Sequence, residues 1–234
     1  MQAIWSAQVA AHTHTPVIKR LYSDGGSGLL LTMGAAVDLG GHQLTRGVYI
    51  LPVKKIADSI SMPPASLLCG IRFLPAVAFA LTGQHYQQPT RLGDDSPFEG
   101  EQLLWQLQSQ NDNTSRIRLL YEWATRHLPA DDTRPRPLSQ ALNGIRQHQE
   151  LAALNELTSL SQRQLERLFQ HWLSMSPKQY QRIVRVRHAI QQLKAPKPHA
   201  ASLTDIAHHC GFSDQAHMTR EFRAIARVTP GKIG

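Results

Sequence analysis

The sequence of 234 residues is long enough for two modest domains, each with a core of its own. Its formal net charge of +8 is unevenly placed, because residues 1–133 hold 10 Lys and Arg against 11 Asp and Glu, whereas residues 134–234 hold 15 against 6. The two cysteines, Cys69 and Cys210, are too few and too far apart for a disulfide framework or a four-cysteine zinc site.

Short aliphatic runs separated by glycines characterise residues 17–74. The runs VIKRLY, GLLLTM, VYILPV and SLLCGIRFL alternate with turn-forming stretches such as DGGSG and DLGGH. Short strands with glycine-rich turns between them predict a small β-rich unit. Three later segments, AVAFAL, EQLLWQL and residues 117–128, have apolar residues every three or four positions, which predicts helices that accompany the β unit.

A proline-rich segment, PADDTRPRPL, marks a break at about residues 128–138. Prolines remove backbone donors and disfavour helix in the residue before them, so we expect a linker here. The prediction is an α+β chain with two domains. Residues 1–133 would form a β-rich N-terminal domain with helices, and residues 134–234 an all-α domain.

The apolar stretches predict neither a signal peptide nor a membrane span. Residues 1–15 carry no basic residue before their short apolar stretch, and the most apolar segment, residues 66–83, is interrupted by Arg72 and Pro75. We therefore expect a cytoplasmic protein with no membrane partner, in which both cysteines are buried thiols.

Residues 203–226 predict a short helix, a tight turn and a second helix. Gly211 can take the positive φ that such a turn demands, and Ser213 and Asp214 offer side-chain oxygens to cap the helix after the turn. The apolar face of that helix has members spaced i, i+4, i+7 and i+8: Met218, Phe222, Ile225 and Ala226. Its outer face is polar and basic: Gln215, His217, Thr219, Arg220 and Arg223. This is the geometry of a helix-turn-helix unit that enters a major groove.

A similar arrangement precedes it at residues 151–172. Leu151, Leu154 and Leu157 mark a short helix, Ser161 caps the next one, and a third helix starts at Pro177. The second helix buries residues at i, i+3, i+4 and i+7: Leu165, Leu168, Phe169 and Trp172. Its other side carries polar and charged side chains, Gln162, Arg163, Glu166 and Arg167 among them; Arg can donate two hydrogen bonds to guanine, and Gln can pair in the same bidentate way with adenine. The excess positive charge after residue 133 favours a polyanionic partner, since neutralised phosphates release counterions.

Two long segments carry a resemblance to a known family. LSQRQLERLFQHWLSMSPKQYQRIVRVRHA, residues 160–189, and DIAHHCGFSDQAHMTREFRAIARVTPGK, residues 205–232, resemble the DNA-binding domain of the AraC/XylS family of transcription regulators. The resemblance implies that two recognition helices enter successive major grooves about 34 Å apart. It also implies which residues face bases: Arg163, Glu166 and Arg167 in the first helix, and Gln215, His217 and Arg220 in the second. Duplex DNA is thus the expected partner, with RNA polymerase, a small-molecule effector and a second copy of the chain left open.

The sequence departs from the family pattern at two places in the first unit. Ser159 stands where the family usually has a turn glycine, and Asn155 where it usually has alanine. In the N-terminal part, GIRFLPAVAFALTG, residues 70–83, resembles a segment of short N-terminal domains found on some regulators of this family. Sensing of a ligand and dimerisation are what that architecture implies.

Other interpretations of the chain have weaker support. His12, His14 and His42 have no nearby carboxylate or cysteine to complete a metal site, so no metal or other cofactor is expected. Regulators of this type that are fused to alkyl-transfer repair domains need several cysteine thiolates, and the N-terminal part has Cys69 alone. No glycine-rich phosphate loop or nucleophile elbow occurs, so an enzyme is not expected. The remaining alternative is a ligand-binding or protein-interaction module whose DNA-binding domain has degenerated.

Overall fold

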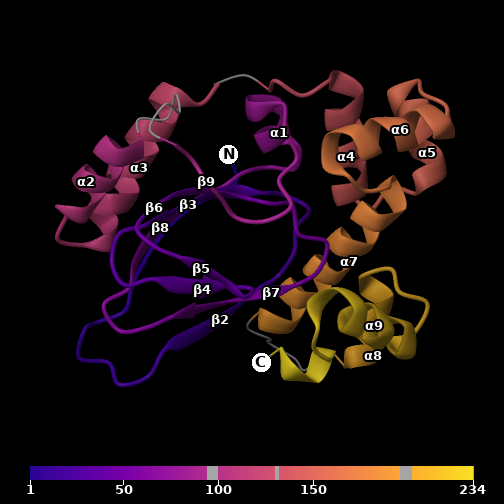
Figure 1. Ribbon diagram of the computed structural model, residues 1–234. Helices are drawn as coiled ribbons and strands as arrows, with labels where there is room; N and C mark the ends of the chain where they lie inside the picture. The colour runs from indigo at the N-terminus through magenta and orange to yellow at the C-terminus, as the bar shows by residue number, and fades with distance from the viewer. Residues whose placement is uncertain (94–99, 130–131, 196–201, 234) are drawn as a thin grey trace. The chain divides into compact units, whose positions relative to one another are not determined.

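The computed structural model describes residues 1–93, 100–129, 132–195 and 202–233 (Figure 1). The chain divides into two compact units. The N-terminal unit comprises residues 1–21, 26–53 and 58–134, and the C-terminal unit comprises residues 22–25, 54–57 and 135–234. The first is mainly β and the second mainly helical, so the fold class is α+β, as predicted.

Two antiparallel sheets form the centre of the N-terminal unit. The larger has the strand order β1-β8-β3-β6-β9 and the smaller the order β2-β7-β4-β5. The strands are β1 (Ala3–Gln8), β2 (Val17–Leu21), β3 (Gly28–Thr32), β4 (Val37–Leu39), β5 (His42–Leu44), β6 (Gly47–Leu51), β7 (Asp58–Met62), β8 (Leu67–Arg72) and β9 (Thr90–Arg91).

Alternation of side chains along the strands gives this unit two cores. In β8, Leu68 packs with residues of the smaller sheet, whereas Cys69 and Ile71 pack with the helices. Gly70 pairs with Trp5 of β1, and a Cβ at Gly70 would come within 2.4 Å of the Trp5 ring. The larger sheet is therefore buried on both faces, which explains the nearly continuous apolar runs of its central strands.

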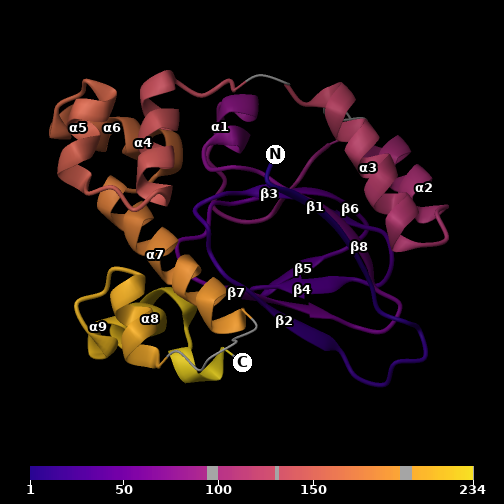
Figure 2. The ribbon, with the colours of Figure 1, turned by 180° about the vertical axis from the view of Figure 1, so that it is seen from behind.

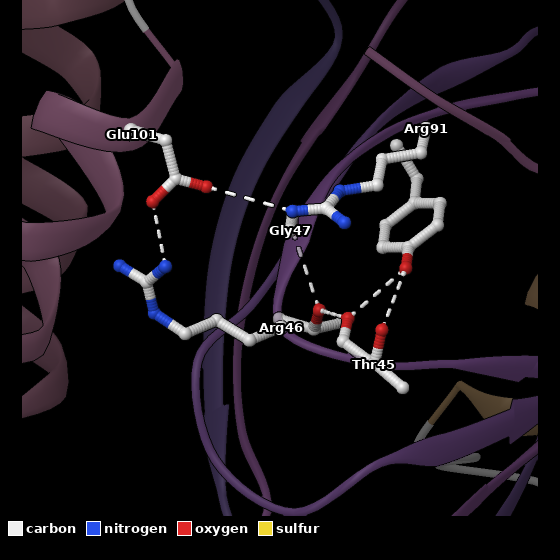
Figure 3. Close-up of polar contacts among 7 residues, drawn as sticks. Thr45, Arg46, Gly47, Arg91 and Glu101 are labelled. Atoms are coloured by element: carbon white, nitrogen blue, oxygen red, sulfur yellow. Dashed lines mark hydrogen bonds and ion pairs between the residues drawn. The ribbon is translucent and has the colours of Figure 1, made fainter. Parts of the chain in front are cut away.

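Three helices complete this unit: α1 (Val77–Thr82), which lies between β8 and β9 in the sequence, α2 (Gly100–Gln108) and α3 (Asn113–His127). Leu103, Leu104 and Leu120 join the core on the helix side of the larger sheet. At the start of α2, Glu101 accepts from Arg46 at 2.6 Å and lies 3.7 Å from Arg91 of β9, as Figure 3 shows. Polar contacts thus connect α2 to the residue just before β6 and to β9.

The C-terminal unit consists of helices and short helical turns. They are α4 (Arg136–Arg146), α5 (Leu151–Thr158), α6 (Gln162–Leu173), α7 (Pro177–Lys194), α8 (Leu203–His209), α9 (Gln215–Glu221), a π-helical turn η1 (Phe222–Ala226) and a 3₁₀ turn η2 (Pro230–Lys232). Figures 1 and 2 show α7 running from the group of α4, α5 and α6 to the group of α8 and α9. It packs against both groups and buries Ile183, Val186 and Ile190.

Several elements differ from the sequence-based expectations. Strands β1, β4, β5, β7 and β9 were not predicted, because they are mixed in polarity or only two or three residues long and are defined by pairing with other strands. Helix α4 begins at Arg136, inside the segment 128–138 predicted as a linker, and Pro137 is tolerated in its first turn, where backbone donors are unpaired anyway. Residues 130–131 of that segment lie outside the described residues. No helix in the described part of the chain is both long and apolar enough to cross a membrane.

Candidate nucleic-acid interface

The first helix-turn-helix unit consists of α5, a short turn and α6. Ser159 ends α5 in the left-handed conformation, at φ 55° and ψ 29°, which is the conformation that glycine adopts most easily. Ser161 then caps α6, and Gln164 completes a reciprocal capping box with it. The turn thus has the geometry of a glycine turn without the glycine, and the predicted cap at Ser161 is confirmed.

One of the predicted apolar positions of this unit is wrong. Leu154 is fully buried, but the side chain of Leu157 is 39% exposed. Each step of three residues falls short of a full helical turn by about 60°, so Leu157 has rotated about 120° from Leu151. In the predicted stripe of α6, Leu165 and Phe169 are buried, whereas Leu168 and Trp172 are partly buried.

The polar side of α6 is open. Gln162, Arg163, Glu166 and Arg167 are all exposed. The amide of Gln162 donates to Glu166 Oε1 at 3.3 Å, and this bond holds Glu166 on the polar side of α6. Within the described part of the chain, no hydrogen bond or ion pair engages the guanidinium groups of Arg163 and Arg167.

The second unit consists of α8, the turn at Gly211 and α9. Gly211 adopts φ 77°, as predicted, and its backbone N–H donates to the carbonyl of His208. Asp214 caps α9 by accepting from the backbone N–H of His217. That hydrogen bond, and to a lesser extent the charge of Arg220, lower the pKa of Asp214, so the cap remains a carboxylate in neutral solution.

The predicted residues of α9 and η1 differ in their exposure and in the contacts of their side chains. Gln215, Arg220 and Arg223 are exposed. His217 is partly buried, its Nδ1 lies 3.1 Å from Ser213 Oγ, and its ring meets the Phe212 ring edge to face. Thr219 is partly buried and its hydroxyl donates to the Gln215 carbonyl at 2.9 Å. Arg220 and Arg223 thus have more freedom to reach a ligand than His217 and Thr219 have.

One contact that fixes α9 was not found from sequence. The guanidinium of Arg182 on α7 donates two hydrogen bonds to Glu221, at 2.8 and 3.0 Å. These bonds raise the pKa of Arg182. The partners are 39 residues apart, so no local pattern indicates the pair. A second missed feature, the capping box of Ser202 and Asp205 at the start of α8, does have a local signal in the Ser-x-x-Asp spacing.

The two cysteines lie in the cores of their units. Cys69 is buried in β8 and Cys210 at the end of α8, and both are free thiols. Burial raises the pKa of each thiol above its ordinary value, which keeps the sulfur protonated and poorly nucleophilic at neutral pH. In the described residues, no group of three or more His, Cys, Asp or Glu side chains is arranged to hold a metal ion.

Comparisons with known proteins show which proteins this chain resembles. A family model described as "Helix-turn-helix domain" matches residues 154–233, a range that runs from α5 to η2. The HTH-type transcriptional activator RhaS of Escherichia coli O157:H7 is 31% identical over 131 residues, 54% of this chain. The chain carries an AraC-type helix-turn-helix domain. The HTH-type transcriptional regulator GbdR of Pseudomonas aeruginosa is 35% identical to this chain over 81 residues, 35% of its length.

The matched region covers less than half of the length of either relative. The matches cover 39% of the length of RhaS and 21% of GbdR. A solved structure of ToxT from Vibrio cholerae aligns with 98% of this chain and 96% of its own, with a TM-score of 0.52 and 9% identity. That alignment shows that the fold of the whole chain, including the β-rich unit, has a counterpart.

Proposed function

We propose that the chain is a sequence-specific DNA-binding transcription regulator that inserts α6 and α9 into successive major grooves. The observation that carries the proposal is the pair of helix-turn-helix units packed on one continuous helix, α7, each with exposed Arg and Gln side chains on its second helix. Arg donates two hydrogen bonds to guanine, and Gln makes a bidentate pair with adenine. The excess of basic over acidic residues after residue 133 supports attraction to phosphates.

Within this proposal, the base-reading side chains come from α6 and from the segment α9–η1. Arg163, Arg167 and Arg220 are the primary readers, because they are exposed and long enough to reach base edges. Glu166, held by Gln162, accepts from a cytosine amino group or orients a neighbouring arginine. The other proposed contacts, with bases or with phosphates, come from Gln215, His217, Thr219 and Arg223.

The first test is selection of bound sequences from a random duplex library with the full-length protein. Two short sequence blocks about one helical turn apart would support reading by both units, and one block would leave a unit as a backbone clamp. No enrichment would contradict sequence-specific binding.

A salt titration separates this function from the alternative of a binding module with a degenerate DNA-binding domain. Each phosphate contact contributes a slope of about −0.9 to the dependence of log K on log salt. A steep slope is expected, and a flat response would favour the alternative.

A single substitution tests base reading. Arg220→Ala should weaken binding to the selected duplex by about 1 to 3 kcal/mol and have less effect on a scrambled duplex. Arg126→Ala, at an exposed arginine of α3 in the N-terminal unit, is the matched control and should change neither. An equal loss on both duplexes would make Arg220 a phosphate contact instead.

We further propose that the N-terminal unit binds an effector and thereby controls DNA binding. This unit holds a cavity of about 510 Å³ whose lining is largely apolar and includes Phe73, Val77, Leu81 and Leu128. A solved ToxT structure contains an unsaturated fatty acid. Oleic acid is therefore a suitable probe: it should raise the melting temperature of the wild type, and less so that of Leu81→Glu, which places a negative charge in the apolar lining. No shift in the wild type would count against an apolar acid as effector.

The remaining partners belong to the same proposal. A regulator of this kind acts in the cytoplasm, on the nucleoid, and makes contact with RNA polymerase at its promoters. It does so as a monomer or as a homodimer, which sedimentation of the full chain with and without the selected duplex would distinguish.

A further inference from the structure

Three histidine side chains from different elements meet in the C-terminal unit. His148 lies in the turn between α4 and α5, His188 in the second half of α7, and His209 in the last turn of α8. The ring centroids of His148 and His188 are 4.7 Å apart, and those of His188 and His209 are 5.8 Å apart. The His188 ring is therefore in contact with the turn that leads into α5 on one side and with α8, the first helix of the second unit, on the other. His188 is partly buried, whereas His148 and His209 are exposed.

The surroundings of His188 favour its uncharged form. Its Nε2 lies 3.3 Å from Nε2 of Gln192, an amide nitrogen that can donate but not accept. In this orientation of the amide the ring nitrogen accepts, which leaves the proton of the neutral ring on Nδ1, a buried atom with no hydrogen-bond partner among the described residues. A second proton, on Nε2, would face this donor unless the amide turned over. Burial lowers the pKa of His188, and so do the charges that His148 and His209 acquire.

Charged groups on the surrounding elements do not offset this repulsion. On α4, Arg146 donates to the Tyr180 hydroxyl at 3.3 Å, and on α7, Arg185 lies over the Phe212 ring. Other nearby charges are engaged or exposed: Arg187 pairs with Asp24, Asp205 belongs to the capping box of α8, and Glu150 is exposed at the N-cap of α5. Among the described residues, no carboxylate is hydrogen-bonded to any of the three rings. The charges that the cluster gains on protonation are thus all of one sign.

We propose that this histidine cluster makes the spacing of the two recognition helices, and with it two-groove DNA binding, dependent on pH. The inference rests on the proposed function. With neutral rings, the α4–α5 turn and α8 lie against His188 of α7 without charge repulsion. Protonation places like charges on rings 4.7 and 5.8 Å apart, which pushes α8 and the α4–α5 turn away from α7 while each unit keeps its own core. His188 is a positioning residue in this proposal and does not touch DNA.

The expected change in two-block DNA affinity on acidification is opposite in sign to the change that simple charge attraction would cause. Added protons raise the positive charge of the protein, which strengthens its attraction to phosphates. Loss of the correct spacing weakens only those duplexes that both recognition helices must engage. A selective loss of two-block binding in acid would therefore separate the cluster from general electrostatics.

The test compares two duplexes with the full-length protein: the best two-block sequence from the random-library selection, and the same duplex with one block scrambled. Dissociation constants are measured in steps from about pH 7.5 to about pH 5, a range that extends well below the ordinary histidine pKa of about 6.5 because the pKa of His188 is lowered. We expect the two-block advantage to fall about tenfold or more in acid, which is about 1.4 kcal/mol of relative binding free energy. An advantage that is unchanged in acid would overturn the proposal.

Substitutions assign the effect to the cluster. His188→Phe keeps a flat ring but cannot be charged, so it should retain the two-block advantage over the whole pH range. His209→Gln removes one charge and should retain part of it, which provides a second variant if His188→Phe folds poorly. The matched control is His208→Gln, at the exposed histidine next to His209 on α8, which should behave as the wild type. An acid-sensitive His188→Phe protein would overturn the proposal.

A readout without DNA distinguishes failure of this inference from failure of the proposed function. The pKa of His188 is lower in the folded unit than in the unfolded chain, so its contribution to stability is complete above about pH 6.5 and is lost as the pH falls through the folded-state value. Hydrogen exchange in α7 and α8 should therefore speed up in acid for the wild type and less so for His188→Phe. If DNA is not bound at any pH, the proposed function fails. If DNA is bound and neither readout depends on pH, the function stands and the cluster proposal is rejected.

Discussion

Replacing Ser159 by glycine should stabilise the first helix-turn-helix unit. The residue has φ 55° and ψ 29°, a left-handed conformation that costs a non-glycine residue about 1 to 2 kcal/mol. Glycine removes this strain but gains about 0.5 to 1 kcal/mol of extra entropy in the unfolded chain. Ser159 is exposed, and no hydrogen bond of its hydroxyl occurs among the described residues, so no contact offsets the gain. We expect Ser159→Gly to raise the free energy of unfolding by about 0.5 to 1 kcal/mol.

The effect is measurable globally and locally. For a unit of about 100 residues, this free energy corresponds to a rise in melting temperature of about 2 to 8 °C. Hydrogen exchange of the α5 and α6 amides reports the same gain at the turn itself. Ser174→Gly is a matched variant, because Ser174 ends α6 at φ 54° and ψ 31° and should respond in the same direction. A Ser159→Gly protein whose α5 and α6 amides exchange as fast as in the wild type, or faster, would refute the strain argument.

Three further substitutions test other contacts of the C-terminal unit. Asn155→Ala removes a buried carbonyl oxygen that has no hydrogen-bond partner among the described residues, so it should raise the free energy of unfolding by about 1 kcal/mol in a urea titration. Asn143→Ala, at an exposed site of α4, should change it little. Gly211→Val puts a β-branched residue at φ 77°, which should cost at least about 1 to 2 kcal/mol and weaken DNA binding; unchanged affinity and melting temperature would contradict this. Glu221→Gln weakens the pair with Arg182 and should speed hydrogen exchange in α9 with a loss of about 1 kcal/mol, an effect that vanishes in an Arg182→Gln background if the pair is its cause.

Local chemistry explains what could be predicted from the sequence. A glycine turn, a serine cap or a proline in a first helical turn depends on neighbours within a few residues, and Gly211, Ser161 and Pro177 all lie as expected. The apolar stripes of α6 and of α9 with η1 were also predicted correctly, because helical spacing is a local property. The fold class was predicted from the same signals.

What could not be predicted depends on pairing across the chain. Strand β7 reads DSISM and is half polar, and it becomes a strand because it pairs with β2 and β4. The contact of Arg182 with Glu221 and the meeting of the three histidines join elements that only the fold brings together. The choice of side chains that read bases depends on the DNA as well, so the residues assigned to that role on α6 and α9 stay a prediction.

The helix that joins the two helix-turn-helix units has a consequence for how the gene can vary in length. Helix α7 spans 18 residues, and every residue added to an α-helix lengthens it by about 1.5 Å and rotates the chain beyond it by about 100°. A single inserted codon within α7 would therefore rotate α9 by about 100° relative to α6, and the proposed recognition helices would no longer face the same side of a duplex. Seven inserted codons would nearly restore the rotation, to within about 20°, but would displace the second unit by about 10 Å along the helix. Codons in this stretch can be exchanged, but their number fixes the distance and the rotation between the two helix-turn-helix units.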